Sequence, residues 1–230
     1  MQAGADSKLR VALLDDHQST LDGYALRLGQ SPQIELAGAA VFGEELESML
    51  AARPVNVLLL DVHVPTAENN PNPYPILHTI PSLLERYPGL VILVVSMIRD
   101  RSLIRAVMEA GASGYILKND RTAILALDSI VRSVAKGEIF LSEEARQELQ
   151  KHAGPEEAEN RLSPRQTQAL SLCAAHPEWT HLDVAAYMSI APSTARNTLH
   201  GAYLHLGVNN LASAIAKARR LGLITPLEPR

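Results

Sequence analysis

The sequence predicts a doubly wound α/β domain with a five-stranded parallel sheet, followed by a small all-α domain. Short apolar runs alternate with helix-like segments from residue 8 to about residue 137, and no strand-like run returns after residue 160. Such alternation is typical of a parallel sheet covered by helices. The length of 230 residues exceeds the commonest domain size, which also favours two domains.

The expected strands are the apolar runs 9–14, 34–39, 55–60, 91–95 and 114–117. The expected helices, whose apolar residues recur near helical spacing, are 20–29, 44–52, 76–87, 101–110 and 122–136. The run 55–60 is the most continuously apolar, which indicates a central strand buried on both faces.

Polar side chains follow four of these strands. Asp15 and Asp16 follow the first, Asp61 the third, Ser96 the fourth and Lys118 the fifth. Ligands of open parallel sheets bind outside the carboxyl ends of the strands, so we expect these side chains to share one crevice. A single Asp after a strand is usually a turn or helix-cap residue, but capping does not account for the Ser and Lys at the other strand ends.

The residue types favour phosphate chemistry. Three carboxylates close together repel one another unless a cation is present, and an all-oxygen set suits Mg²⁺. Asp61 is the expected nucleophile that forms an acyl phosphate, with Ser96 donating to a phosphoryl oxygen and Lys118 neutralising its charge. Asp15 and Asp16 are expected to hold the metal ion, one directly and one through water.

Several motifs carry a family resemblance. Leu-Leu-Asp15-Asp16-His17, Asp61-Val-His-Val-Pro65, Val-Val-Ser96-Met and Gly111-Ala-Ser-Gly-Tyr-Ile-Leu-Lys118 resemble the receiver domain of two-component response regulators. Lys136-Gly-Glu-Ile-Phe-Leu-Ser, Leu162-Ser-Pro-Arg and Leu206-Gly-Val are similar to the NarL/FixJ subfamily, which carries a LuxR-type helix-turn-helix. The implied organisation is a receiver over 8–137, a linker over 138–160 with a short helix over 142–151, and a DNA-binding domain over 161–225.

The resemblance implies roles for particular residues. Asp61 would be the phosphoacceptor, and the Mg²⁺ ligands would be Asp15, Asp16, Asp61 and the backbone carbonyl of His63. Ser96 and Tyr115 would form a switch that shifts the face made by the fourth helix, fifth strand and fifth helix, through which the chain would dimerise. A structural role for Tyr115 as a sheet-end aromatic stays open, and His17 is expected to be positional.

The last third predicts a four-helix module. Ser163-Pro164-Arg165-Gln166 is a capping box that opens a helix to about residue 175, and Thr180 to Asp183 repeats the pattern before a helix to residue 188. A third helix is expected over 192–206, and Asn209 is expected to cap a fourth that ends at residue 220.

Charge favours DNA as a partner of this module. From residue 161 onward, seven Arg and Lys residues face three Asp and Glu residues, a net charge of +4, whereas the whole chain carries −4. The expected recognition helix 192–206 presents Ser193, Thr194, Arg196, Asn197 and His200. This helix has fewer basic residues than the family's usual recognition helix, so weak DNA binding stays open as an alternative. Arg196 and His200 could then be solvent-exposed side chains without a role in DNA binding. Gly201 in the middle of the helix costs about 1 kcal/mol of stability relative to Ala.

The stretch 66–75 is longer than the family's usual loop and rich in proline, which predicts an extended, stiff loop. Because it borders the expected crevice, it could alter kinase docking, shield the acyl phosphate or contact the helical domain. An inert insertion is the alternative.

We expect a cytoplasmic transcriptional regulator that is not an enzyme. Its partners would be DNA, a histidine kinase or small phosphodonor, and a second regulator in a homodimer or heterodimer. An interaction protein with a weakened helical module is the first alternative. The second is an aspartyl-phosphate hydrolase, which would need an Asp where His63 stands. No apolar run approaches the ~20 residues needed to span a bilayer, and no signal peptide is recognisable. Because Cys173 is the single cysteine, no internal disulfide can form.

Overall fold

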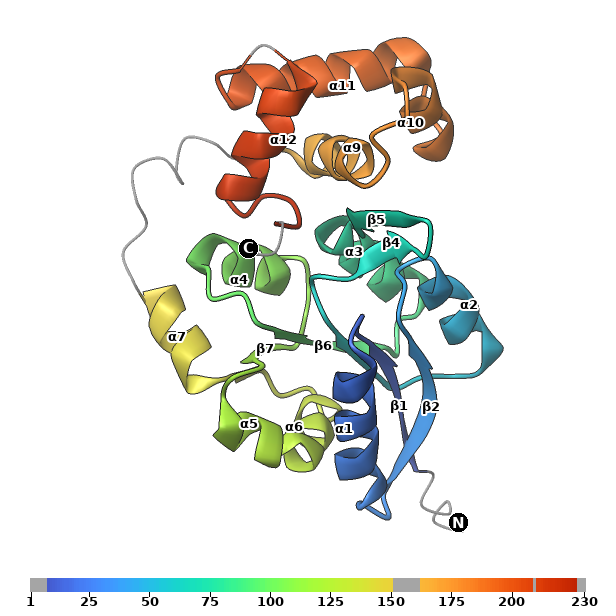
Figure 1. The fold of residues 1–230 in the computed structure, drawn as a ribbon, viewed down its shortest axis with the longest axis vertical. Helices are drawn as coiled ribbons and strands as arrows, with labels where there is room; N and C mark the ends of the chain where they lie inside the picture. The colour runs from blue at the N-terminus through green and yellow to red at the C-terminus, as the bar shows by residue number, and fades with distance from the viewer. Residues whose placement is uncertain (1–7, 151–161, 209, 227–230) are drawn as a thin grey trace.

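The computed structural model describes residues 8–150, 162–208 and 210–226 (Figure 1). Its main sheet has the strand order β2-β1-β3-β6-β7-β8, and every neighbouring pair is parallel. The strands are β1 (Leu9–Leu14), β2 (Ile34–Ala40), β3 (Val57–Leu60), β6 (Val91–Ser96), β7 (Gly114–Leu117) and β8 (Phe140–Leu141). The predicted doubly wound class is confirmed, and all four residues of β3 are buried, as expected for a central strand.

Helices cover both faces of this sheet (Figure 1). They are α1 (Gln18–Gly29), α2 (Glu45–Ala52), α3 (Ile76–Arg86), α4 (Arg101–Glu109), α5 (Arg121–Leu125) and α6 (Leu127–Val134). One apolar core packs beneath α2, α3 and α4, and the other beneath α1 and α6. The single helix expected over 122–136 is wrong in one respect, because Ala126 takes a φ of −93° and a ψ of 13° and divides it into two.

The first part of the expected linker is folded against the α/β domain. Strand β8 pairs with Gly114 and Tyr115 of β7, so the sheet has six strands instead of the five expected. The predicted short helix is α7 (Glu143–Gln150), which packs on α4 and β7. Arg99 holds it through ion pairs with Glu144 at 3.0 Å and Glu148 at 3.3 Å. Much of the face expected for dimerisation is therefore covered by the chain itself, while residues 151–160 of the linker lie outside the described part.

The stretch expected as an extended loop is instead an antiparallel hairpin of β4 (Pro65–Ala67) and β5 (Asn70–Pro73). The backbone amide of Tyr74 donates to the carbonyl of Val64 at 2.9 Å, and the Thr66 hydroxyl donates to the carbonyl of Asn72 at 2.8 Å. The prolines of this segment occupy strand positions that can do without an amide donor, so the chain is extended but paired with itself.

The helical domain consists of α9 (Pro164–Ala175), α10 (His181–Tyr187), α11 (Pro192–His205) and α12 (Leu211–Arg220). Both predicted capping boxes are present, at Ser163 with Gln166 and at Thr180 with Asp183. The expected cap of the last helix is one residue off: Asn210 accepts from the amide of Ser213 at 2.8 Å, and Asn209 lies outside the described residues.

Two residues of this domain gain a structural explanation. A Cβ on Gly201 would lie 2.7 Å from Nε2 of Gln166, so the glycine lets α11 approach the capping side chain of α9. Cys173 is buried in the core, and burial raises the pKa of its thiol to about 11, as expected for a packing residue. In the described part of the chain, no helix combines the length and apolarity needed to cross a membrane.

Candidate functional site

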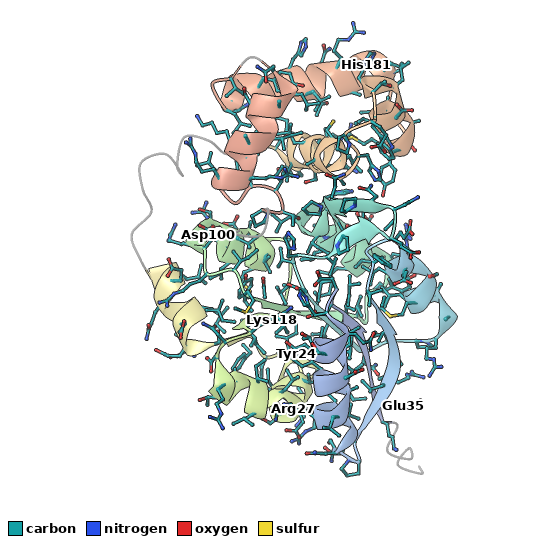
Figure 2. All side chains as sticks on the ribbon, in the orientation of Figure 1. Tyr24, Arg27, Glu35, Asp100, Lys118 and His181 are labelled. Carbon is teal, nitrogen blue, oxygen red and sulfur yellow. The ribbon has the colours of Figure 1, made fainter. Side chains whose placement is uncertain are left out.

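The candidate site lies at the carboxyl ends of four neighbouring strands. The strands β1, β3, β6 and β7 are consecutive in the sheet; Asp15, Asp61 and Lys118 directly follow three of them and Ser96 ends the fourth. Nζ of Lys118 lies 2.6 Å from Oδ2 of Asp15 and 2.7 Å from Oδ2 of Asp61. Figure 2 shows Lys118 at this end of the sheet, with Tyr24 of α1 nearby. The structure thus brings together side chains that are about a hundred residues apart in the sequence.

The site is buried and strongly coupled electrostatically. Asp15 is 2% exposed and Asp61 is 5% exposed. Burial raises the pKa of Asp15 above its usual range; the Asp61 charge raises it further, while the hydrogen bond and charge of Lys118 oppose the rise. Burial alone would lower the pKa of Lys118, but the two carboxylates outweigh it and raise the pKa. The ammonium therefore stays charged and serves as counter-ion to both acids.

Local turns aim the carboxylates. Oδ1 of Asp15 accepts from the amide of His17 at 3.0 Å, and Oδ1 of Asp61 accepts from the amide of His63 at 3.2 Å. Each carboxylate is thus fixed by the backbone two residues later, as in an Asx turn. The second oxygen of each acid is left to face the same cation.

Asp16 lies at the rim of the crevice. Its carboxylate is 23% exposed, and its Oδ1 lies 2.6 Å from Nδ1 of His17. Among the described residues, Asp15, Asp16 and His17 form a group whose ligand atoms all lie within 4.8 Å of one another. His17 therefore lies directly beside the acidic cluster, next to the crevice.

Ser96 and Tyr115 meet at a residue that sequence analysis missed. Oγ of Ser96 accepts from the amide of Ile98 at 3.2 Å, and the Tyr115 hydroxyl donates to the carbonyl of Ile98 at 2.8 Å. Both side chains are fully buried, and burial raises the pKa of Tyr115. The aromatic ring of Tyr115 packs in the core as a sheet residue would, but its hydroxyl fixes the loop after Ser96. Together the two residues hydrogen-bond both the amide and the carbonyl of Ile98.

Tyr24 is a second residue that the motifs did not indicate. It is buried on α1 and lines a narrow space together with Asp15 and Asp61. Burial raises the pKa of Tyr24, and the charges of Asp15 and Asp61 add to the rise. The phenol stays neutral beside the acids. Only the three-dimensional packing of α1 on β1 and β3 reveals this position.

Helix α11 carries the residues expected to meet DNA. Thr194, Arg196, Asn197 and His200 are exposed, while Ala195, Leu199 and Ala202 of the same helix are buried. Ser193 belongs to α11, but its side chain lies outside the described set. Nη2 of Arg196 lies 3.2 Å from Nε2 of His181, which joins α11 to the start of α10. The exposed face therefore combines a guanidinium, an amide and two imidazoles.

Comparison with known proteins decides the family. The DNA-binding transcriptional activator DevR/DosR of Mycobacterium tuberculosis is 30% identical over 217 residues, which are 93% of this chain and 95% of that protein. This chain belongs to the NarL/FixJ family of response regulators. The oxygen regulatory protein NreC of Staphylococcus epidermidis is 32% identical over 136 residues, or 58% of this chain. That match spans 57% of NreC, and further relatives of this NarL/FixJ chain match over a similar share of their length. No family model matches the sequence.

Solved structures agree with the fold of this NarL/FixJ chain. RcsB from Salmonella enterica serovar Typhimurium, bound to promoter rprA in the presence of the phosphomimetic BeF3-, has a TM-score of 0.63 at 21% identity. The match covers 92% of this chain and 98% of that one. At this identity the likeness speaks for the fold, a parallel α/β receiver followed by a helical domain.

Proposed function

We propose that this NarL/FixJ response regulator controls transcription by accepting a phosphoryl group on Asp61 and binding DNA through α11. The observation that carries the first half is the single ammonium of Lys118 bridging two buried carboxylates at 2.6 and 2.7 Å. The functional units we propose are a receiver over 8–137, a linker over 138–160 and a DNA-binding domain over 161–225. DevR/DosR, by name a DNA-binding transcriptional activator, supports the second half. The cytoplasm is the compartment we propose.

Phosphoryl transfer needs a nucleophile and a way to neutralise charge. Oδ2 of Asp61 attacks the phosphorus of a histidine kinase phosphoimidazole or a small acyl phosphate. The new oxygen–phosphorus bond forms as the donor's bond breaks, and the imidazole or carboxylate leaves with the electron pair. Lys118 neutralises the phosphoryl charge, and the Ser96 hydroxyl turns from Ile98 to donate to a phosphoryl oxygen. The site modifies itself, so the chain is a regulator and not an enzyme.

The donor set fits Mg²⁺. Asp15 and Asp61 converge on one cation, and Asp16 lies beside them with a partly exposed carboxylate. These carboxylates and the backbone carbonyl of His63 are the ligands we propose. They are hard oxygen donors, which suit Mg²⁺ better than softer metals. When bound, the ion would neutralise the charge of the incoming phosphoryl group.

We propose a dimerisation surface that shares only the fifth expected helix with the face predicted from the sequence. Helix α7 and strand β8 cover the edge of β7, so the face of α4 and β7 is largely taken. On the other side of the receiver, Leu26 of α1 is 69% exposed and Leu125 of α5 is 56% exposed. We propose that this surface joins two copies of the chain, or this chain and a second regulator.

Arg196→Ala is expected to weaken binding to a selected duplex by roughly 5-fold to 150-fold, because a bidentate contact to a base edge contributes about 1–3 kcal/mol. Binding to random duplexes should change much less. Fluorescence anisotropy across a salt series measures both. The control is Arg121→Ala, which removes an exposed arginine from the receiver.

Equal losses for the two variants would remove α11 from DNA recognition. If no duplex shows salt-sensitive association with the wild-type chain, the regulator acts through a protein partner instead. That second reading is favoured by the small number of basic side chains on α11, where Arg196 is the one arginine or lysine of the helix.

A further inference from the structure

The basic side chain of α11 has a partner on the preceding helix. Arg196 is the one Arg or Lys of α11, and its Nη2 lies 3.2 Å from Nε2 of His181, the first residue of α10. Figure 2 shows His181 at the corner where α10 and α11 come together. The contact therefore joins the two helices of the helix-turn-helix through side chains that are fifteen residues apart in the sequence.

The chemistry of the two groups fixes the direction of this hydrogen bond. A guanidinium has five N–H donors and no acceptor, so Arg196 donates and Nε2 of His181 accepts. The imidazole is then neutral and carries its proton on Nδ1. Because a single N–H of Arg196 is used, four remain, which is enough for a bidentate contact with a base edge.

The position of His181 is set by the cap of α10. Oγ1 of Thr180 accepts from the amide of Leu182 at 3.2 Å. The amide and the hydroxyl of Thr180 both donate to Oδ2 of Asp183 at 2.7 Å. His181 lies between these capping residues on a fixed turn. The Asp183 carboxylate is engaged by Thr180, so the imidazole is the group that Arg196 meets.

Packing sets the separation of the two helices. Val184 and Ala185 of α10 and Ala195 and Leu199 of α11 are buried in the same apolar core. Arg196 follows Ala195 and is exposed on the opposite face of α11. The core thus holds the backbones on either side of the hydrogen bond, and the side chains of His181 and Arg196 meet across the outer surface.

Holding the guanidinium before DNA arrives favours binding. An arginine side chain has many rotamers and loses this freedom when it is fixed against a base. A side chain that is already held in place loses less of it on binding. Because α11 has a single basic residue, the placement of Arg196 matters more here than in a recognition helix with several.

We propose that His181 is a positioning residue for DNA recognition, which accepts a hydrogen bond from Arg196 and aims the remaining N–H groups of that guanidinium at a guanine in the major groove. The inference rests on the proposed function, in which α11 binds DNA, and names the group that sets its specificity. Guanine is the base whose O6 and N7 accept from arginine in pairs. His181 acts through Arg196 and needs no contact with DNA of its own.

His181→Ala tests this role in the full chain. Duplexes are first selected from a random pool with the wild type, and dissociation constants are then measured for a selected and a random duplex. The variant is expected to bind the selected duplex about threefold to tenfold more weakly, the effect of one hydrogen bond, with little change for the random duplex. His181→Gln should keep most of the specificity, because its side-chain carbonyl can accept from Arg196 in place of Nε2.

A double-mutant cycle separates positioning from a general structural effect. In the Arg196→Ala background, His181→Ala should cause no further loss of selected binding, because the group that it positions is absent. The matched control is His205→Ala, which removes another exposed imidazole of this domain. The ring of His205 lies 3.1 Å from the carbonyl of Gly201 in its own helix, and its removal should leave the preference for the selected duplex unchanged.

The outcomes distinguish this inference from the proposed function. If Arg196→Ala weakens selected binding while His181→Ala behaves like His205→Ala, Arg196 reads DNA without help and the positioning role is wrong. A loss in His181→Gln as large as in His181→Ala, or losses that add fully in the double variant, would also overturn it. If Arg196→Ala itself leaves selected binding unchanged, the DNA role of α11 fails and the role of His181 fails with it.

Discussion

Asp61→Asn is expected to yield a folded chain that no longer responds to acetyl phosphate or beryllofluoride. The amide keeps the volume of the carboxylate but offers no anionic oxygen to attack phosphorus or to bind beryllium. Lys118 keeps its second partner, Asp15, at 2.6 Å, so the folded site survives. We therefore expect complete loss of the phosphorylated mass species, and no increase in DNA affinity on treatment.

The matched control is Asp22→Asn, which removes an exposed carboxylate on α1, outside the candidate site. It should take up phosphate like the wild type. If Asp61→Asn and Asp22→Asn respond alike in mass, in oligomeric state and in DNA binding, another group accepts the phosphate and Asp61 has a structural role only.

Lys118→Met is expected to lower the free energy of unfolding by about 3–5 kcal/mol, because it leaves two buried carboxylates without their cation. The loss should be largest without divalent metal and smaller in Mg²⁺, which can replace the ammonium. Urea denaturation in chelator and in excess Mg²⁺ measures the difference. The control is Lys136→Met, an exposed lysine after α6.

The pH dependence of this loss follows from Asp15. Burial already raises its pKa, and removal of the ammonium raises it further. The folded variant therefore prefers the protonated acid, so its stability deficit is full at pH values above the raised pKa and shrinks as the pH falls through it. A deficit that equals that of Lys136→Met, or that ignores both Mg²⁺ and pH, would mean that the ammonium is not the counter-ion of this pair.

The convergence of the site could be predicted because it depends on features that the sequence states directly. The apolar runs mark the strands, and a parallel sheet brings their carboxyl ends to one edge. The residue that follows each run is then placed without knowledge of packing. Asp15, Asp61 and Lys118 meet for this reason, although their burial and distances needed the structure.

The elements that were missed depend on contacts distant in the sequence. The β4–β5 hairpin is rich in proline and asparagine, which have low strand propensity, and it is stabilised by bonds to the loop before α2. Strand β8 has two residues and exists because β7 offers an unpaired edge. The hydrogen bonds of Ser96 and Tyr115 to the Ile98 backbone also arise from tertiary packing. So does the close approach of Gly222 to the first turn of α4, and local sequence patterns give no signal for either contact.

Phosphorylation of Asp61 can be measured by intact-mass spectrometry of the full chain after incubation with acetyl phosphate in Mg²⁺ or in chelator. We expect one added phosphoryl group in Mg²⁺, mapped to Asp61 after borohydride trapping, and none in chelator. A phosphoryl group on a different residue, or equal uptake with and without Mg²⁺, would contradict it.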